Sequence, residues 1–167
     1  MGSDFDKFAD SLQKTILQQM AETYSRKVME IFLNPKNIGR MDKPDGYGRV
    51  TGPCGDTMEI CLRVKDDKIA EAKFFTDGCG TSIVCGSIVT ELAKGRRVED
   101  ASDITKETVL ESLGGLPEAD QHCALLAADT LREAIADSLK LKGGPPAREG
   151  FVKKDINGIT LKPDERG

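Results

Sequence analysis

The sequence predicts an α+β domain in which a small three-stranded antiparallel sheet is packed with several helices, preceded by an amphipathic helical extension. Three observations lead to this fold class. Apolar residues near the N-terminus recur at spacings of three and four, the period of one helical face. The segment TMEICLRVK (57–65) alternates apolar and polar residues, as a half-buried strand does. Beyond residue 80 the apolar pattern returns to helical spacing.

The N-terminal part of the chain is expected to form one long helix over residues 4–33, which the Asn34-Pro35 pair ends. One face of this helix carries large apolar side chains that need a surface to cover them. That surface is either the protein's own domain or the same helix of a second copy in a homodimer. The apolar face consists of Phe5, Phe8, Leu12, Ile16 and Met20.

Three strands are expected after a loop over residues 34–48, which is rich in Gly, Pro, Asn and Asp. A strand around residues 47–52 precedes the one over 57–65. A turn at Asp66-Asp67-Lys68 then leads into a third strand over 69–76, which makes an antiparallel hairpin. Met58, Ile60, Leu62 and Val64 face one side of the sheet, and Cys61 lies on the opposite, polar side.

Helices and a tail make up the rest of the chain. A helix is expected from about residue 81 to residue 94, with Gly95 as its stop; Thr105 caps a short helix that ends at Gly114-Gly115. The last helix runs from about 120 to 141. The segment 142–150 has a linker composition, and DINGIT (155–160) fits a type I′ hairpin. The expected units are an N-terminal helical extension (1–23), a main domain (24–141) and a C-terminal tail (142–167).

The composition narrows the class of protein. A chain of 167 residues is long enough for one domain with a real core. The net charge of −4 argues against nucleic acid as a partner, and no apolar run approaches the roughly 18 residues that span a membrane. The absence of a basic-then-apolar leader predicts a cytoplasmic protein. Five cysteines, an odd number, argue against a disulfide framework in that compartment.

The cysteines fall into two groups. Cys85 lies on an apolar helical face and is expected to be a small core residue, and Cys61 on the polar strand face is expected to meet solvent or loose packing. Cys54 lies in the tight loop GPCGD, Cys79 lies between two glycines, and Cys123 lies in the first turn of the last helix. A helix N-terminus favours the thiolate, so the sequence predicts that Cys79 and Cys123 ionise readily.

The second group is a candidate metal site. Its cysteines are far apart in sequence, unlike the closely spaced pairs of zinc fingers and ribbons, so they can meet only through the fold. Asp56 and His122, the only histidine, are further candidate ligands. Each has an ordinary alternative, a turn for the aspartate and a helix cap for the histidine. A carboxylate or a neutral imidazole can complete a site that three thiolates leave short of one ligand.

These motifs resemble the IscU/NifU-type iron–sulfur cluster assembly scaffolds. The likeness covers about residues 24–140 and is carried by C-G-D, G-C-G and H-C in that order. It includes YSRKVMEIFLNPKNIG, CGDTMEICLRVKDDKIAEAKFFTDGCGTSI, VTELAKGR and LGGLPEADQHCALLAADTLREAIAD. The resemblance implies an IscU/SufE-like fold and a scaffold that assembles 2Fe–2S clusters rather than an enzyme.

The resemblance also implies roles for individual residues. Cys54, Cys79 and Cys123 are the ligand cysteines, Asp56 and His122 are auxiliary ligands, and Cys123 accepts persulfide sulfur from a cysteine desulfurase. Iron, an electron donor such as a ferredoxin and acceptor apo-proteins complete the implied set of partners. Which of Asp56 and His122 ligates the assembled cluster stays open. A carboxylate is expected to be the weakest holder of a finished cluster.

One segment departs from the family pattern. Family members served by a dedicated chaperone carry L-P-P-V-K before H-C, whereas this chain has Leu116, Pro117, Glu118, Ala119 and Asp120. An acidic residue in place of the lysine does not favour chaperone-dependent release.

The sequence leaves three alternative functions open. The first is a zinc-binding protein of the same fold that relays persulfide, using Cys54, Asp56, Cys79 and Cys123; the presence of His122 favours the scaffold. The second is a thiol hydrolase with a Cys123–His122 pair, but adjacent helical residues point about 100° apart. The third, a pure interaction module, leaves the glycine-framed cysteines unexplained.

Overall fold

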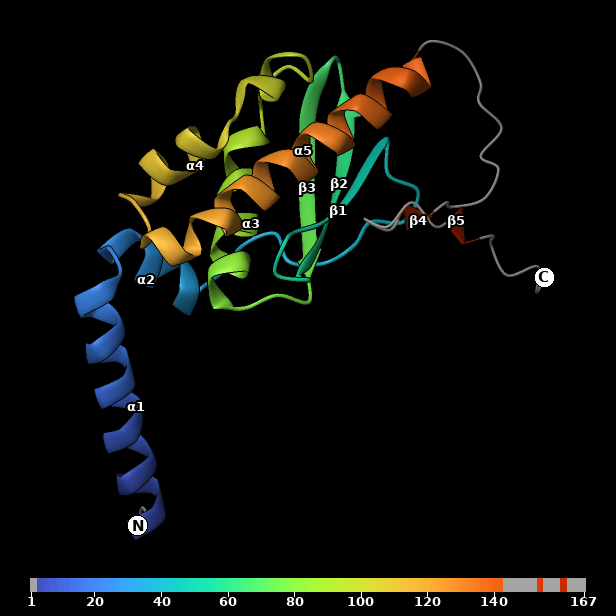
Figure 1. The fold of residues 1–167 in the computed structure, drawn as a ribbon. Helices are drawn as coiled ribbons and strands as arrows, with labels where there is room; N and C mark the ends of the chain where they lie inside the picture. The colour runs from blue at the N-terminus through green and yellow to red at the C-terminus, as the bar shows by residue number, and fades with distance from the viewer. Residues whose placement is uncertain (1–2, 143–152, 155–159, 162–167) are drawn as a thin grey trace, which may run out of the picture.

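The computed structural model describes residues 3–142, 153–154 and 160–161 (Figure 1). Its helices and strands follow the predicted order, and helices α3 and α5 pack on each other and on the sheet. In chain order the elements are α1 (Asp4–Thr23), α2 (Arg26–Leu33), β1 (Gly46–Thr51), β2 (Thr57–Lys65), β3 (Lys68–Thr76), α3 (Gly80–Ala93), η1 (Asp100–Asp103), α4 (Lys106–Leu113), η2 (Glu118–Asp120), α5 (Gln121–Lys142), β4 (Lys153–Lys154) and β5 (Thr160–Leu161).

The main sheet has the order β1-β2-β3 with both pairs antiparallel, as predicted. Ile60 in the central strand pairs with Gly48 on one side and with Phe74 on the other. Asp66 and Asp67 both have positive φ, 52° and 63°, at the β2–β3 turn. Two such residues give the turn a twist that matches the twist of the strands, so the hairpin closes in two residues.

The core lies between one face of the sheet and helices α3 and α5. The inward side chains of β2, Met58, Ile60 and Leu62, are fully buried, which confirms the predicted alternation. Side chains that share this core come from every major element of the main domain. Among them are Phe74, Val84, Cys85, Val89, Val109, Leu113, Ala124, Ala127, Leu131 and Ile135.

Strand β1 lies directly against the backbone of α5. A Cβ atom added at Gly46 would lie 2.4 Å from the carbonyl oxygen of Ala134, and one at Gly48 would lie 2.4 Å from that of Thr130. No side chain fits between the two backbones. The two glycines therefore set how closely the last helix approaches the sheet.

The predicted single helix over residues 4–33 is wrong. α1 ends at Thr23 with Tyr24 in extended conformation, and Ser25 begins α2 by accepting a hydrogen bond from the Val28 backbone N–H at 3.2 Å. The Ser25 hydroxyl also donates to the carbonyl oxygen of Leu113 at the end of α4. This contact ties the chain to α4 at the point where the first helix stops, and α1 projects away from the domain (Figure 1).

The apolar face of α1 is exposed except at Met20, which is half-buried. None of its residues is buried, and Phe5 and Phe8 expose 74% and 64% of their surface. The expectation that this face packs on its own domain is therefore wrong, and only the homodimer alternative is left untested. Leu12 and Ile16 continue the same exposed stripe toward α2.

The expected placement of Cys61 is also wrong. The residue is 3% exposed, and burial raises the pKa of its thiol. The loop before β1 covers this face of the sheet: Arg63 donates to the carbonyl oxygens of Lys43 at 2.9 Å and Asp42 at 3.1 Å. A strand face that looks solvent-facing in the sequence is thus covered by a segment distant along the chain.

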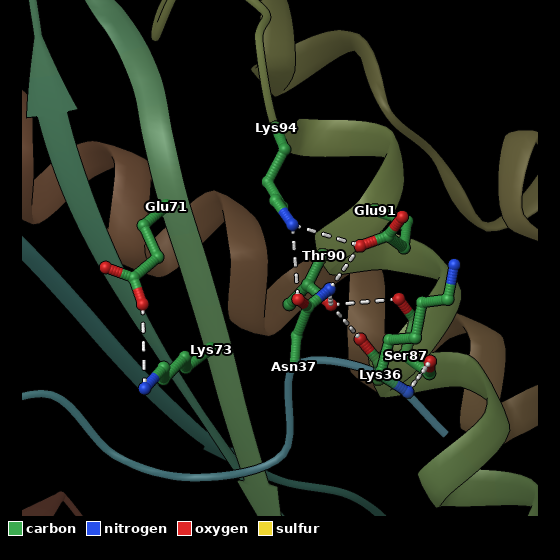
Figure 2. A network of polar contacts seen from close by, with 9 residues as sticks. Lys36, Asn37, Glu71, Lys73, Ser87, Thr90, Glu91 and Lys94 are labelled. Carbon is green, nitrogen blue, oxygen red and sulfur yellow. Dashed lines mark hydrogen bonds and ion pairs between the residues drawn. The ribbon is translucent and has the colours of Figure 1, made fainter. Parts of the chain in front are cut away.

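The beginning of the same loop is anchored to α3, as Figure 2 shows. The backbone N–H of Lys36 donates to the Ser87 hydroxyl at 2.9 Å. Asn37, with φ of 65°, donates from its side chain to Glu91 at 2.7 Å and to the Thr90 hydroxyl at 3.1 Å. These bonds hold the start of the loop against the side of α3 that carries Ser87, Thr90 and Glu91.

The later helices form as predicted within one or two residues. Thr105 caps α4 by accepting from the Thr108 N–H, and Gly114 ends it with φ of 73°. In the tail β4 and β5 pair antiparallel, while the linker and the expected turn at 155–159 lie outside the described residues. Within the described residues, no helix combines the length and the apolar character needed to cross a membrane.

Candidate functional site

The five candidate ligands come from three places in the chain and converge at one end of the sheet. Cys54 and Asp56 lie in the loop between β1 and β2, and Cys79 is the N-cap of α3. His122 and Cys123 lie in the first turn of α5. Hydrogen bonds through His122 and through the Ser82 hydroxyl connect the five side chains.

His122 connects the two cysteines on one side of the site. Its Nε2 atom lies 3.2 Å from Sγ of Cys54 and 3.5 Å from Sγ of Cys123. Cys54 is exposed, and Gly55 beside it has φ of 86° with open space around it. The loop therefore presents the Cys54 sulfur to solvent and to His122 at once.

Ser82 connects the other side of the site. Its hydroxyl oxygen lies 3.2 Å from Oδ2 of Asp56, 3.5 Å from Sγ of Cys123 and 3.9 Å from Sγ of Cys79. Ser82 is fully buried in the first turn of α3. Sequence reasoning missed this residue, because a serine in the first turn of a helix is ordinary and gives no signal of its own.

Gly78 leaves the space in which these groups meet. A Cβ atom at this position would lie 2.7 Å from the Asp56 carboxylate and 2.7 Å from the Ser82 hydroxyl. Any side chain here would push the two apart. The glycine before Cys79 thus allows the carboxylate to reach the start of α3.

The electrostatics of Cys79 agree with the prediction from the sequence. Burial alone opposes its ionisation, but the backbone N–H groups of Ser82 and Thr81 and the Ser82 hydroxyl outweigh this effect. The pKa of the Cys79 thiol therefore lies below its ordinary value. The side chain is exposed, so its sulfur is both accessible and easily ionised.

For Cys123 the same prediction is wrong. Its side chain is fully buried, and burial raises the pKa of the thiol to about 11, against a smaller opposing effect of the Ser82 hydroxyl. Desolvation thus outweighs the favourable position in the first turn of a helix. In this conformation the Cys123 thiol is covered, and burial disfavours its ionisation.

The remaining two cysteines lie in packed regions. Cys85 is fully buried in α3 and burial strongly raises the pKa of its thiol, which confirms its expected place in the core. Cys61 lies under the loop before β1. Neither has the exposure that Cys54 and Cys79 share.

The site holds suitable donors but not a finished coordination geometry. Three sulfurs, a carboxylate and an imidazole form a set that suits iron–sulfur clusters and zinc. Among the described residues, however, no three His, Cys, Asp or Glu side chains already stand around a common point that could hold a metal ion. Ligation therefore requires these side chains to turn from their hydrogen bonds toward the ion.

A cavity of about 320 Å³ opens beside Cys79. Across it the Tyr24 hydroxyl donates to Oδ2 of Asp120 at 2.7 Å, and this hydrogen bond is the main reason why the pKa of Tyr24 is raised. Asp120, which stands where chaperone-served family members carry a lysine, is therefore hydrogen-bonded within the protein. The cavity is lined by Met20, Tyr24, Val28, Phe32, Cys79, Gly80, Thr81, Val84 and Asp120.

Comparison with known proteins shows the family of this chain. The family described as "NifU-like N terminal domain" matches residues 23–142. Archaeoglobus fulgidus has a relative named "Iron-sulfur cluster assembly scaffold protein IscU 1", which is 48% identical over 72% of this chain and 79% of its own length. Rickettsia prowazekii has an "Iron-sulfur cluster assembly scaffold protein IscU", which is 45% identical over 68% of this chain and 90% of its own length.

Solved structures show the same fold at low sequence identity. A nitrogen-fixing NifU-like protein (N-terminal) from Brucella abortus is similar with a TM-score of 0.57 and 19% identity, covering 73% of this chain and 98% of the other. A putative scaffold protein for the SUF system from Fervidobacterium islandicum is similar with a TM-score of 0.55 and 21% identity, covering 69% and 98%. The match over residues 23–142 and the relatives at 45–48% identity establish that the chain belongs to the NifU-like N-terminal domain family.

Proposed function

We propose that this protein is a scaffold on which iron–sulfur clusters are assembled before they pass to acceptor proteins. One observation carries the proposal: Cys54, Cys79 and Cys123 meet at one end of the sheet, with Asp56 and His122 between them. Relatives at 45–48% identity that are named as such scaffolds support it. The cluster is cargo in this proposal, and the protein is a carrier rather than an enzyme.

The donor set suits a cluster that has to leave. Proteins that keep a 2Fe–2S cluster for electron transfer hold it with four thiolates. Here three thiolates are available, and the fourth ligand is Asp56 or His122, each a harder donor than sulfur. We assign the cargo as a 2Fe–2S cluster on this ground, with iron and sulfur supplied separately.

Sulfur delivery uses the buried cysteine of the site. We assign Cys123 as the acceptor: its thiolate attacks the outer sulfur of a cysteine persulfide on a desulfurase, the S–S bond breaks, and the donor's thiolate leaves. Because the Cys123 sulfur is buried, the start of α5 has to open before the attack. Two electrons from a donor such as a ferredoxin then reduce the bound sulfur to the sulfide level.

The remaining partners follow from this sequence of steps. They are a cysteine desulfurase, an electron donor and acceptor apo-proteins, all in the cytoplasm. Asp120 gives the segment before His122 a negative charge where chaperone-served family members carry a lysine, so we propose release without a dedicated chaperone.

Anaerobic reconstitution tests the proposal. The protein is incubated with ferrous iron, cysteine and a cysteine desulfurase, and visible spectra are recorded with iron and sulfide analysis. Sulfur-to-iron charge-transfer bands with matching iron and sulfide are expected, and each of Cys54→Ala, Cys79→Ala and Cys123→Ala should abolish them. Cys61→Ala and Cys85→Ala are the matched controls, because these cysteines lie outside the site.

A different result would overturn the scaffold. A colourless protein that binds one zinc ion tightly and carries only a persulfide would instead be a sulfur-transfer protein of the same fold. Trypsin digestion and mass spectrometry after sulfur delivery would then locate the persulfide, and its presence on Cys79 in place of Cys123 would correct the assigned acceptor.

A further inference from the structure

The hydroxyl of Ser82 occupies an unusual position for a helical serine. The side chain is fully buried, and a buried hydroxyl is unfavourable unless it is hydrogen-bonded. Two other buried helical hydroxyls donate to their own helix: Thr90 to the Gly86 carbonyl oxygen at 2.8 Å and Thr130 to that of Leu126 at 2.7 Å. The partners of Ser82 are instead side chains of the candidate site.

The number of protons on this hydroxyl limits what it can do. A serine hydroxyl donates one hydrogen bond and can accept two. The nearest acceptor is Oδ2 of Asp56 at 3.2 Å, and Sγ of Cys123 follows at 3.5 Å. The hydroxyl is the donor in both contacts and has one proton, so in the cluster-free protein Asp56 and Cys123 share that proton.

Cluster binding changes this balance. Once Cys123 ligates iron as a thiolate, its sulfur carries negative charge and accepts this hydrogen bond more strongly. The Ser82 proton then serves either the carboxylate or the ligand sulfur, and both lie within its reach. Hydrogen bonds to ligating groups orient them and tune the metal, and hydrogen bonds to cluster sulfurs influence the reduction potential.

We propose that Ser82 is a positioning residue, whose hydroxyl holds the Asp56 carboxylate and the Cys123 sulfur in the positions needed for cluster assembly. The inference rests on the proposed scaffold function and adds to it a residue that the ligand motifs do not include. Gly78 supports it, because the absence of a side chain there is what allows Asp56 and Ser82 to meet.

The test compares Ser82→Ala with Ser87→Ala. Ser87 is a matched control, since it is a buried serine of the same helix whose hydroxyl accepts from the Lys36 N–H away from the site (Figure 2). Both full-length variants are reconstituted anaerobically. Relative to wild type, Ser82→Ala should show shifted visible circular dichroism bands and lose its cluster to a chelator about tenfold faster. Ser87→Ala should match wild type in both measurements.

A second measurement uses the cluster-free protein and does not depend on the proposed function. The infrared S–H stretch of Cys123 is identified by its absence in Cys123→Ala. His122 lies as close to this sulfur as Ser82 does. The position of the band in one variant is therefore not enough, and the comparison of Ser82→Ala with Ser87→Ala shows the effect of Ser82. Ser82→Ala should shift the band, because the sulfur loses the hydrogen bond that it accepts from Ser82, and Ser87→Ala should leave the band in place.

The outcomes separate the two claims. Wild type and Ser87→Ala could assemble clusters, and Ser82→Ala could match them in its circular dichroism bands, its cluster retention and its S–H frequency. This result would overturn the inference about Ser82 and leave the scaffold proposal standing. If wild type assembles nothing, the scaffold proposal fails, and the S–H shift still decides whether Ser82 holds Cys123. Ser82→Gly, which also lacks the hydroxyl, replaces Ser82→Ala if that variant does not fold.

Discussion

The cysteines of the site differ in how readily they lose a proton. Cys79 is exposed and the pKa of its thiol is lowered, whereas Cys123 is buried and the pKa of its thiol is raised to about 11. A lowered pKa keeps the thiolate present as the pH falls, so alkylation of Cys79 should persist at a pH where ordinary thiols have stopped reacting. Cys123 and Cys85 should stay unmodified in the folded protein. Peptide mass spectrometry after timed iodoacetamide treatment measures each site.

The variant Cys79→Ala is the control for this experiment. It should remove the component of alkylation that survives at low pH and leave the rest unchanged. Rapid low-pH modification of Cys123 in the folded wild type would mean that the first turn of α5 does not cover the sulfur as described here.

Asp56 is expected to weaken the hold on a finished cluster. A carboxylate is a harder ligand than a thiolate, so it exchanges more readily and lets the cluster leave. Asp56→Ala should therefore retain its cluster longer and transfer it more slowly to an apo-ferredoxin, followed by the visible circular dichroism of the acceptor. Transfer as fast as or faster than in wild type would show that Asp56 does not promote release.

The sequence predicted which residues meet in the site, and the reason is chemical. Cysteines at helix starts and beside glycines have few structural uses, so Cys54, Cys79 and Cys123 could be distinguished from Cys85 without coordinates. The role of Ser82 could not be predicted, because it depends on a distance of 3.2 Å to Asp56, which lies 26 residues earlier. The burial of Cys123 likewise depends on packing between α3 and α5 that no local pattern encodes.

At the scale of elements, the junction between α1 and α2 depends on one serine. Ser25 accepts from the Val28 N–H and donates to the Leu113 carbonyl oxygen, so it caps α2 and joins it to α4. Ser25→Ala should lower the free energy of unfolding by about 1–2 kcal/mol, since a cap is lost and a carbonyl loses its partner. Urea denaturation followed by circular dichroism measures the change.

Ser3→Ala provides the comparison, because Ser3 also caps a helix. Its hydroxyl accepts from the Asp6 N–H at 3.3 Å, but α1 buries none of its residues. This variant should leave the unfolding transition in place and reduce only the helical signal. Equal destabilisation by both variants would mean that α1 unfolds together with the domain.

The two errors at this scale have the same physical origin. Helical periodicity continues past Tyr24 and predicted one helix, while the break is set by a bond between Ser25 and a carbonyl 88 residues later. Alternation along β2 predicted that Cys61 lies on the solvent-facing side of the sheet. In the structure the loop that includes Asp42 and Lys43 covers this side. In both cases local pattern was correct for its own segment, and a distant segment decided the outcome.

At the scale of the whole molecule, we propose that the extension over residues 1–23 is separable from the domain over residues 24–141. α1 contacts α2 and contributes no buried residue. A chain lacking residues 1–23 should therefore unfold at nearly the same urea midpoint, within about 0.5 kcal/mol of the full chain. Cluster reconstitution on both chains checks that the site is intact.

The same pair of chains addresses the exposed stripe of α1. Sedimentation of the full and shortened chains compares their masses in solution. A dimer that becomes a monomer on truncation would identify the face of Phe5 and Phe8 as the contact between copies. A large loss of stability in a monomeric protein would instead contradict the proposed boundary.

The close approach of β1 to α5 has a kinetic consequence. With Gly46 and Gly48 leaving no gap at Ala134 and Thr130, the helix has no room to slide on the sheet. Exposure of Cys123 therefore has to come from fraying of the first turn, and helix–coil changes of this size take about a microsecond. Encounters between proteins at micromolar concentration are far slower, on the order of seconds. Stopped-flow measurements should thus show sulfur delivery rising in proportion to donor concentration, with no plateau set by the scaffold's own motion.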